Sequence, residues 1–453
     1  MATSTQLRLF QEGARFTVKA HHHEKEWGTF KDSLRAPIHN WFTYPAGFSY
    51  KAVECSLEAH SVGAGKCIYD PFMGTGTTNL TAKKLGLNSF GTEAHPFVYW
   101  VAKTKLNWSI NQKDALMACR SVCEAVENQQ RQFTGNAEEA VQAVFPELVL
   151  KCFDYRTLLD LLFIRDSIDQ LSASRSIRDF LSLGLTSVLR QVASVATGWP
   201  YIAPNKEKTT SANKLALTEF SNQIKQMLLG IQITMNEAHS NWAQTEHKIF
   251  ETDCRNTVGK VPDKVADHIF TSPPYLNNYD YADRTRMELY FFGEAQTWGD
   301  ITKLVRDKLI TSATTQINRE EERYKVSADI EQANPRVFDF LQASVVELGK
   351  RRLLKGGKKS YDYMVSGYFN DLFKVLTDCH RILKKGKKAI FVLGDSAPYG
   401  VHIPTDELIG KLGVSVGFSN YDMKVLRERG GKWKDNPQRH DVLLRESIVT
   451  LTK

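Results

Sequence analysis

The stretch that decides the fold is KCIYDPFMGTGTTNL, residues 66–80. It begins as a short apolar strand ending at Asp70, and a turn with two glycines, Gly74 and Gly76, leads into a helix at Thr77. A strand, glycine turn and helix in this order present backbone N–H groups and a helix N-terminus to a ligand, with no Cβ atom in the way. The stretch predicts either a ligand pocket at the edge of a parallel sheet or an ordinary connection between a strand and a helix.

The residues around the turn narrow the class of ligand. Asn79 stands where the dinucleotide fingerprint requires its third glycine, and no Gly-Lys-Ser/Thr sequence follows, so neither a dinucleotide nor ATP is expected. Asp70 suits a ligand that carries an amine or a sulfonium group. Glu93 ends a second short strand, where an acidic residue accepts hydrogen bonds from a ribose diol. The pattern favours S-adenosylmethionine.

A second motif, Ser272-Pro273-Pro274-Tyr275, follows the apolar run 268–270. Two successive prolines fix φ and cannot donate to a sheet ladder, so the segment should leave the sheet as a rigid, extended turn. Ligands of open α/β sheets bind beyond the carboxyl ends of the strands, which predicts one crevice for this turn and the glycine turn. Taken alone, the four residues also fit a surface turn.

The second motif suits chemistry at an exocyclic amine of a planar base. The lone pair of such an amine is delocalised into the ring, which makes the nitrogen a poor nucleophile. The Ser272 hydroxyl and the Pro273 carbonyl offer two acceptors for the amine hydrogens. Tyr275 is available to stack on the base, which must leave the duplex to enter the crevice.

In combination these motifs resemble the amino-methyltransferases of DNA, which use S-adenosylmethionine to methylate cytosine N4 or adenine N6. The resemblance implies an α/β, Rossmann-like methyltransferase fold, with a mostly parallel twisted sheet and an antiparallel last strand. Serine at position 272 resembles the N4-cytosine members, since N6-adenine members more often carry Asp or Asn there. Adenine N6 stays open, as does RNA guanine N2, whose enzymes share the fold and more often show Asn-Pro-Pro-Tyr.

The resemblance also implies roles for individual residues. As catalytic residues it implies Ser272, Pro273, Pro274 and Tyr275. As cofactor-binding residues it implies Phe48, Asp70, Pro71, Phe72, Gly74, Gly76, Thr77, Thr78, Glu93, Ala94, Asp253 and Cys254. Asp253 follows the predicted third strand, where the family places a carboxylate that accepts from the adenine amine. No metal is expected, and no Pro-Cys pair is present for covalent methylation of a ring carbon.

At 453 residues the chain is long enough for a catalytic core and a recognition region. We expect residues 1–107 and 246–453 to form the two parts of the catalytic domain. Residues 108–245 show heptad-like apolar spacing with few glycines and prolines, which predicts a helical insertion and a candidate DNA target-recognition region. Within it, residues 198–208 carry aromatics and lysines suited to DNA contact. A charged lid or arm at about 301–365 is the second candidate for reading DNA.

The remaining elements are expected in the C-terminal part. Apolar periodicity predicts a helix from Tyr368 to Leu383 that stops at Lys384-Lys385-Gly386, and then a strand from Ala389 to Gly394. Apolar segments at 421–427 and 442–450 predict a terminal antiparallel hairpin.

Composition agrees with a nucleic-acid enzyme without proving it. The net charge of +8 suits a polyanionic partner, and the hydrophobic content of 42% contains no long apolar run, so no membrane association is expected. Seven scattered cysteines and a polar N-terminus predict reduced thiols and a cytoplasmic location. The resemblance adds double-stranded DNA and a cognate restriction endonuclease as candidate partners, in a restriction–modification setting.

Overall fold

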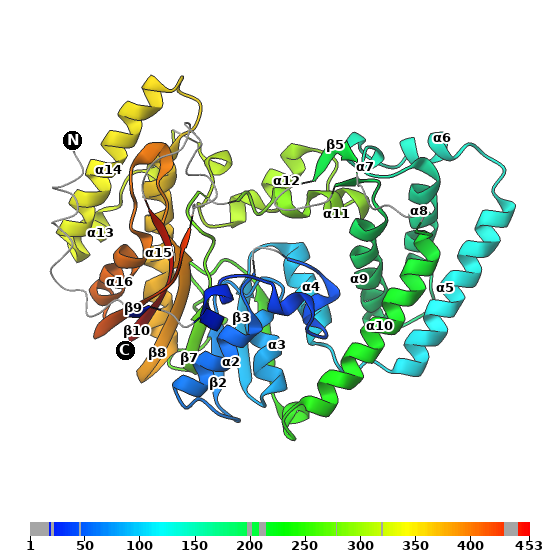
Figure 1. Ribbon diagram of the computed structural model, residues 1–453, viewed down its shortest axis with the longest axis horizontal. Coiled ribbons are helices and arrows are strands. Elements are labelled where there is room, and N and C mark those ends of the chain that lie inside the picture. Colours follow the sequence, from blue (N-terminus) through cyan, green and yellow to red (C-terminus); the bar gives the residue numbers. More distant parts are fainter. Residues whose placement is uncertain are drawn as a thin grey trace.

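A twisted sheet of eight strands forms the centre of the molecule in the computed structural model (Figure 1). The structure describes residues 18–19, 22–44, 47–196, 202–207, 214–277, 279–318, 320–429 and 443–453. The strands are β1 (Val18–Lys19), β2 (Cys67–Asp70), β3 (Asn88–Glu93), β6 (His247–Glu251), β7 (Ala266–Thr271), β8 (Leu383–Gly394), β9 (Asn420–Arg429) and β10 (Leu444–Thr452).

The order of the strands across the sheet is β1-β9-β10-β8-β7-β2-β3-β6. Neighbours from β8 to β6 are parallel, whereas β10, the last strand of the chain, runs antiparallel between β8 and β9. This arrangement confirms the predicted Rossmann-like methyltransferase fold with a reversed last strand. Strands β3 and β6 follow one another on one side of β2, and the next strand along the chain, β7, lies on the other side. The glycine turn after β2 therefore lies at the point where the strand order reverses, which is where ligands bind in doubly wound sheets.

Helices cover both faces of the sheet because the central strands are apolar on both sides. Ile68 and Phe270 pack in one core cluster with residues of α2 (Tyr50–Ala59) and α3 (Thr77–Lys84). Their chain neighbours Tyr69 and Ile269 point to the other face and pack with α15 (Tyr361–Ile382) in a second cluster. The two-residue period of a strand thus assigns alternate side chains to opposite layers.

The other helices of this α/β body are α4 (Pro96–Leu106), α11 (Arg286–Phe291), α12 (Trp298–Leu304), α13 (Ala328–Ala333), α14 (Pro335–Leu354) and α16 (Thr405–Ser415). The 3-10 helices are η1 (His22–Glu26), η2 (Asp32–Leu34), η3 (His39–Trp41), η4 (Trp242–Gln244), η5 (Asp283–Thr285), η6 (Arg306–Lys308), η7 (Thr314–Gln316), η8 (Glu322–Tyr324) and η9 (Pro398–Gly400).

The insertion between β3 and β6 is largely helical, and it stands at one end of the molecule, opposite α13 to α16 (Figure 1). It consists of α5 (Gln112–Gln132), α6 (Ala137–Gln142), α7 (Glu147–Leu150), α8 (Tyr155–Asp169), α9 (Arg175–Val192), α10 (Ala216–Glu237) and the paired strands β4 (Val195–Ala196) and β5 (Ala203–Glu207). Its core is continuous with α4 and α11 of the α/β body.

Two predicted boundaries are wrong. The helix expected from Tyr368 begins at Tyr361, and Lys384 to Gly386 belong to β8 rather than to a helix stop. Strand β8 starts early because Leu383 already pairs with β7, and Gly386 takes a positive φ of 73° beside the register shift that follows. The hairpin strands are β9 and β10, and residues 430–442 between them lie outside the described residues.

The remaining expectations on organisation meet the structure only in part. The charged segment 301–365 contains α13 and α14 in its second half. In the candidate DNA loop, residues 203–207 form β5, while 198–201 and 208 lie outside the described residues. Within the described part of the chain, no helix has the length and apolarity that crossing a membrane requires.

Candidate active site

A pocket opens where the chain leaves the carboxyl ends of β2, β3, β6 and β7. It holds about 830 Å³ of empty space, counted out through its open mouth into solvent. Both sequence motifs contribute to it, as predicted. The predicted site residues that line it are Phe48, Pro71, Phe72, Gly74, Thr77, Glu93, Ala94, Asp253, Cys254, Ser272 and Pro274.

The glycine turn passes from β2 to α3 with left-handed backbone at both glycines. Gly74 has φ of 53° and Gly76 has φ of 87°, a region in which a Cβ atom is strained. Gly76 is the residue before the first turn of α3 and does not line the pocket, whereas Gly74 does. The two glycines therefore differ in function: Gly76 sets the direction of the helix, and Gly74 lets the turn approach the cavity.

Asp70 and Thr78 lie behind the pocket instead of lining it. The Asp70 carboxylate is fully buried and accepts hydrogen bonds from the Phe72 N–H (3.0 Å), the Thr78 hydroxyl (2.7 Å) and the Thr271 hydroxyl (2.6 Å). Burial raises the pKa of Asp70 to about 6, although these three hydrogen bonds oppose the rise. The carboxylate thus ties the glycine turn, α3 and the end of β7 together, and it does not face a ligand.

Glu93 joins the end of β3 to the glycine turn at the pocket wall. Its carboxylate accepts from the Gly74 N–H (3.0 Å) and the His95 N–H (2.9 Å). Burial raises the pKa of Glu93 to about 7, and the backbone N–H groups counteract part of that rise. Each carboxylate oxygen keeps a further acceptor position, so Glu93 can accept from hydroxyl groups of a bound ligand.

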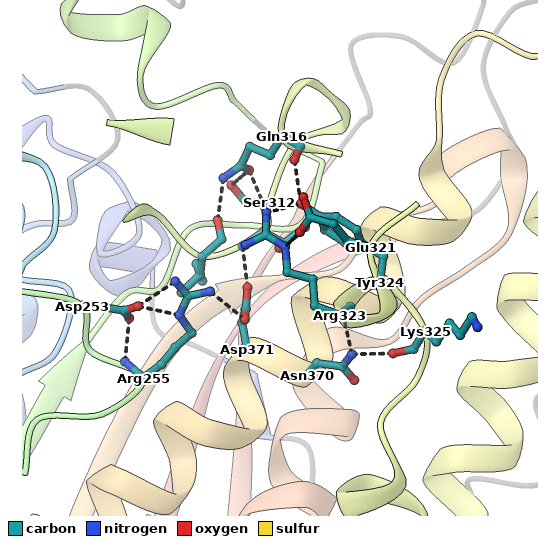
Figure 2. Close-up of polar contacts among 12 residues, drawn as sticks. Asp253, Arg255, Ser312, Gln316, Glu321, Arg323, Tyr324, Lys325, Asn370 and Asp371 are labelled. Carbon is teal, nitrogen blue, oxygen red and sulfur yellow. Dashed lines mark hydrogen bonds and ion pairs between the residues drawn. The ribbon is translucent and has the colours of Figure 1, made fainter. Parts of the chain in front are cut away.

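Asp253 follows β6 and lines the pocket with a partly exposed carboxylate. The Arg255 guanidinium donates to one Asp253 oxygen from Nε (2.8 Å) and from a terminal nitrogen (2.6 Å), and the other oxygen accepts from the Arg255 backbone N–H at 2.9 Å. The second terminal nitrogen of Arg255 reaches Asp371 of α15 at 2.9 Å (Figure 2). The other oxygen of Asp371 accepts from the Thr311 N–H at 2.8 Å. A continuous chain of hydrogen bonds through Arg255 and Asp371 therefore connects Asp253 to Thr311, whose neighbours Ile310 and Ser312 line the pocket.

Ser272 follows β7 and lines the pocket directly. Its hydroxyl donates a hydrogen bond of 2.9 Å to the carbonyl of Val392 in β8. A hydroxyl has one hydrogen to donate, so its oxygen presents only lone pairs to the cavity. The geometry makes Ser272 an acceptor.

Tyr275 does not line the pocket, unlike the prediction that it stacks on a bound base. It is buried, and its hydroxyl donates to Glu446 of β10 at 2.9 Å. Glu446 is itself held by Arg427 at 2.6 Å. Tyr281 lines the pocket in place of Tyr275, and its hydroxyl lies 3.4 Å from the Tyr275 backbone N–H. Pro273 also lies outside the lining, between Ser272 and Pro274.

The aromatic segment before α2 reaches the pocket, as the resemblance implies. Tyr44, Gly47 and Phe48 line it, and the Phe48 ring packs against Phe270 of β7, with ring centroids 5.2 Å apart. These rings give the cavity an apolar wall beside its carboxylates.

Several residues that line the pocket were not among the predicted site residues: Tyr44, Gly47, Met73, Thr75, Tyr281, His95 and four residues between positions 308 and 312. His95 lines the pocket and bonds the Thr285 hydroxyl at 2.6 Å, and burial lowers its pKa to about 3, so the ring is neutral. Lys308, Leu309, Ile310 and Ser312 also line the pocket, from a segment that follows α12. No motif in the sequence indicates that residues 308–312 line the pocket. His95 could have been predicted, because it lies only two residues after Glu93 at the end of β3.

Comparison with known proteins assigns a class to this fold and site. Residues 14–113 match the N6/N4 DNA methylase family. The chain is 26% identical over 455 residues to the type II methyltransferase M.BsoBI of Geobacillus stearothermophilus, covering 94% of this chain and 87% of that protein. Over most of its length the chain is thus a distant homologue of type II methyltransferases, and its N-terminal part matches the N6/N4 DNA methylase family.

Two further relatives agree with this assignment. The type II methyltransferase M.AvaI of Nostoc sp. is 22% identical over 438 residues, covering 91% of this chain and 86% of that protein. M.MjaII of Methanocaldococcus jannaschii, also a type II methyltransferase, is 31% identical over 99 residues, or 22% of this chain and 18% of that protein.

Proposed function

We propose that this protein transfers a methyl group from S-adenosylmethionine to cytosine N4 of a base flipped out of double-stranded DNA. The observation that supports this most strongly is Ser272, which lines the pocket while its hydroxyl donates its hydrogen to the Val392 carbonyl. An exocyclic amine offers hydrogens and needs acceptors, and Ser272 supplies one at the rim of the predicted cofactor pocket.

The residues of the pocket fit S-adenosylmethionine. The ligand combines a ribose diol, an aromatic base and a cationic sulfonium. Glu93 has acceptor positions for the diol, Phe48 and Phe72 supply apolar surface, and Asp253 adds a carboxylate on the same wall. Gly74 allows the chain to approach the ligand closely, and Cys254, Ala94, Pro71 and Thr77 complete the predicted contact set.

The bound cofactor supplies an electrophilic methyl group, and the chain provides position and electrostatics. Ser272 accepts one of the amine hydrogens and helps to draw the nitrogen lone pair out of conjugation with the ring. Tyr281 and Tyr44 are the pocket aromatics available to contact the base. Holding two reactants in line lowers the barrier without a covalent enzyme–base adduct, and preorganised acceptors add to that effect.

The biological setting follows from the relatives and is part of the proposal. Relatives that span most of this chain are named type II methyltransferases. We place the protein in the cytoplasm, in a restriction–modification system with a cognate restriction endonuclease. The helical insertion, residues 108–245, is proposed as the region that recognises the target sequence.

A methyl-transfer assay followed by nucleoside analysis tests this function. Wild-type protein is incubated with S-adenosylmethionine and mixed-sequence duplex DNA, and the digested nucleosides are analysed by mass spectrometry, with tRNA and rRNA in parallel. We expect N4-methylcytosine from the DNA alone. N6-methyladenine would replace the cytosine assignment by the adenine one, and methylated guanosine from RNA alone would overturn the DNA assignment.

A further inference from the structure

The turn that joins α14 to α15 carries an unusual combination of exposed leucines and basic residues. We call residues 350–359, with the sequence KRRLLKGGKK, the basic tip. Leu353 and Leu354 are 73% and 86% exposed. The tip contains six lysines and arginines, and no acidic residue lies between positions 348 and 361.

The backbone of the basic tip is a well-formed helix end. The Gly357 N–H donates to the Arg352 carbonyl at 2.9 Å and the Gly356 N–H to the Leu353 carbonyl at 3.4 Å, and Gly356 has φ of 78°. This is the pattern of a Schellman motif, which normally adds an apolar contact across the helix end. The two positions of that apolar contact are occupied here by Arg352 and Gly357. Neither Leu353 nor Leu354 is therefore needed to close the helix.

Two arginines anchor the tip to the body of the protein. Arg351 donates to Glu347 at 2.7 Å and to the carbonyl of Tyr399, in the loop after β8, at 2.8 Å. Arg352 pairs with Asp362 of α15 at 2.9 Å. The arginines thus point inward, while Lys350, Lys355, Lys358 and Lys359 are exposed beside the leucines.

The tip lies at the edge of the sheet where the pocket opens. Helix α15 leads into β8, which is parallel to β7, so its first residue, Tyr361, lies near the carboxyl ends of these strands. Helices α14 and α15 stand side by side and meet at the tip (Figure 1). Asp371 of α15 accepts from the N–H of Thr311, between the lining residues Ile310 and Ser312, and the helical rise from Tyr361 to Asp371 is about 15 Å. The tip therefore projects beyond the pocket on the side that DNA must approach.

We propose that the basic tip is a DNA wedge: Leu353 and Leu354 enter the duplex beside the target base and hold open the gap that the flipped base leaves. The lysines around them contact the phosphates on either side. Apolar side chains flanked by basic residues act in this way in proteins that unstack or kink DNA. This inference rests on the proposed function, since it assumes that duplex DNA is the substrate.

Substrates that differ in the cost of base flipping test the wedge. One duplex pairs the target base normally, and the other carries a mismatch opposite it, so the base is already easier to extrude. Methyl transfer is measured in a single turnover for the wild type, for Leu353→Ala/Leu354→Ala and for Val346→Ala. Val346 is a matched control, because it is 55% exposed on the same helix but lies outside the tip.

We expect the double variant to be roughly tenfold slower than wild type on the paired duplex and within about twofold of it on the mismatched duplex. Val346→Ala should match the wild type on both. Equal rates for the double variant and wild type on paired DNA would overturn the wedge, as would the same loss on both substrates.

Two further measurements separate this inference from the proposed function. If the wild type methylates no duplex, the proposed function is wrong. Contact between the basic tip and DNA is then tested separately, by measuring the affinity of the protein for a fluorescent duplex. The triple variant Lys355→Gln/Lys358→Gln/Lys359→Gln should bind this duplex more weakly. An unchanged affinity would contradict the proposal that the basic tip contacts DNA. A change of mass in solution caused by Leu353→Ala/Leu354→Ala would instead assign the leucines to a contact between two copies of the chain, which also contradicts the wedge.

Discussion

Two carboxylates with raised pKa values stand beside the glycine turn, and they have different tasks. Asp70 is enclosed by three hydrogen-bond donors behind the turn, whereas Glu93 faces the pocket. The pKa of Asp70 is raised to about 6 and that of Glu93 to about 7, in both cases by burial. Protonation of Asp70 should therefore affect mainly the stability of the fold, and protonation of Glu93 should affect mainly ligand binding.

The replacement Asp70→Asn should flatten the dependence of stability on pH. Folding favours the protonated form of Asp70, so its contribution to the free energy of unfolding is present below about pH 4 and is lost as pH rises through 6. The loss amounts to about 3 kcal/mol for two pKa units. Asparagine keeps an acceptor for the Phe72 and Thr271 donors and carries no charge.

Urea unfolding of wild type and Asp70→Asn between pH 4 and 8 checks this prediction. The variant should gain stability relative to wild type as pH rises. Asp422→Asn, an exposed position on β9, is the control. A constant difference between wild type and Asp70→Asn across this range would contradict the assigned pKa shift.

Cofactor binding should strengthen as pH rises through 7. The Glu93 side chain accepts from ligand hydroxyls best as a carboxylate, and its pKa in the free protein is about 7. The dissociation constant of S-adenosylhomocysteine should therefore be about tenfold larger at pH 6 than at pH 8. Glu93→Gln should bind more weakly at pH 8 and show no such dependence. Calorimetric titration checks both, and an unchanged slope in the variant would assign the pH effect to another group.

At the scale of the elements, α15 supports the pocket wall through buried polar side chains. Asp371 accepts from Thr311 and Arg255, and Asn370 donates to the Arg323 carbonyl at 2.9 Å (Figure 2). The described residues of 309–325, which continue from the pocket lining at 308–312, contain the short helices η7 and η8 and no strand or α-helix, so these side chains replace hydrogen bonds that a sheet or helix would supply.

The replacement Asp371→Ala should loosen this wall without unfolding the protein. It leaves the buried Thr311 N–H without its acceptor and Arg255 with Asp253 as its remaining carboxylate. Hydrogen exchange should become faster in residues 309–325, and cofactor affinity should fall several-fold. Asp378→Ala is the matched control, since Asp378 lies on the same helix and bonds Arg381 and Thr257 instead. Equal exchange changes in the two variants would contradict a specific role for Asp371.

The sequence was informative about elements where apolar runs and turn residues coincide. The strands before Asp70 and Ser272 were predicted because each is a buried run that ends at a glycine or proline turn. The start of α15 was not, because Asp362 and Ser366 are buried polar residues that interrupt the apolar period before Tyr368 and bond to other segments. Periodicity cannot indicate a polar residue that is buried through tertiary contacts.

The same reason limits prediction of the site. The glycine turn, Glu93 and Ser272 were found because local chemistry requires these residue types. The position of residues 308–312 in the pocket lining depends on how separate segments pack. The same is true of Tyr281, which lines the pocket where Tyr275 was expected, because the Tyr275 hydroxyl is held by Glu446 of β10. Asp70 was assigned to the ligand, although its neighbours Thr78 and Thr271 satisfy it internally.

At the scale of the whole molecule, a buried ion pair links the helical insertion to the α/β body. Arg190 of α9 donates to both oxygens of Glu288 in α11, at 2.7 and 3.0 Å, and Glu288 is completely buried. The pair lies close to the segment that follows the Ser272 motif, since Arg190 also bonds the Arg284 carbonyl at 3.0 Å. It can fix the insertion relative to the pocket.

Removal of one partner of this pair should be costly. Glu288→Ala leaves the Arg190 charge without its buried partner and should lower the free energy of unfolding by about 3–5 kcal/mol. The double replacement Arg190→Met/Glu288→Met removes both charges and should recover most of the loss. Urea unfolding of the three proteins checks this, and a loss below about 1 kcal/mol in Glu288→Ala would contradict a structural role for the pair.

The most direct test of the active-site assignment compares catalysis and cofactor binding in Ser272→Ala. Methyl transfer to DNA is measured in a single turnover, and the dissociation constant of the cofactor is measured separately. Ser396→Ala, which follows the neighbouring strand β8 and does not line the pocket, is the control. We predict that Ser272→Ala lowers the rate about 100-fold and leaves cofactor affinity unchanged, since it removes an acceptor for the amine. An unchanged rate, or a loss of cofactor affinity as large as the loss of rate, would contradict the account.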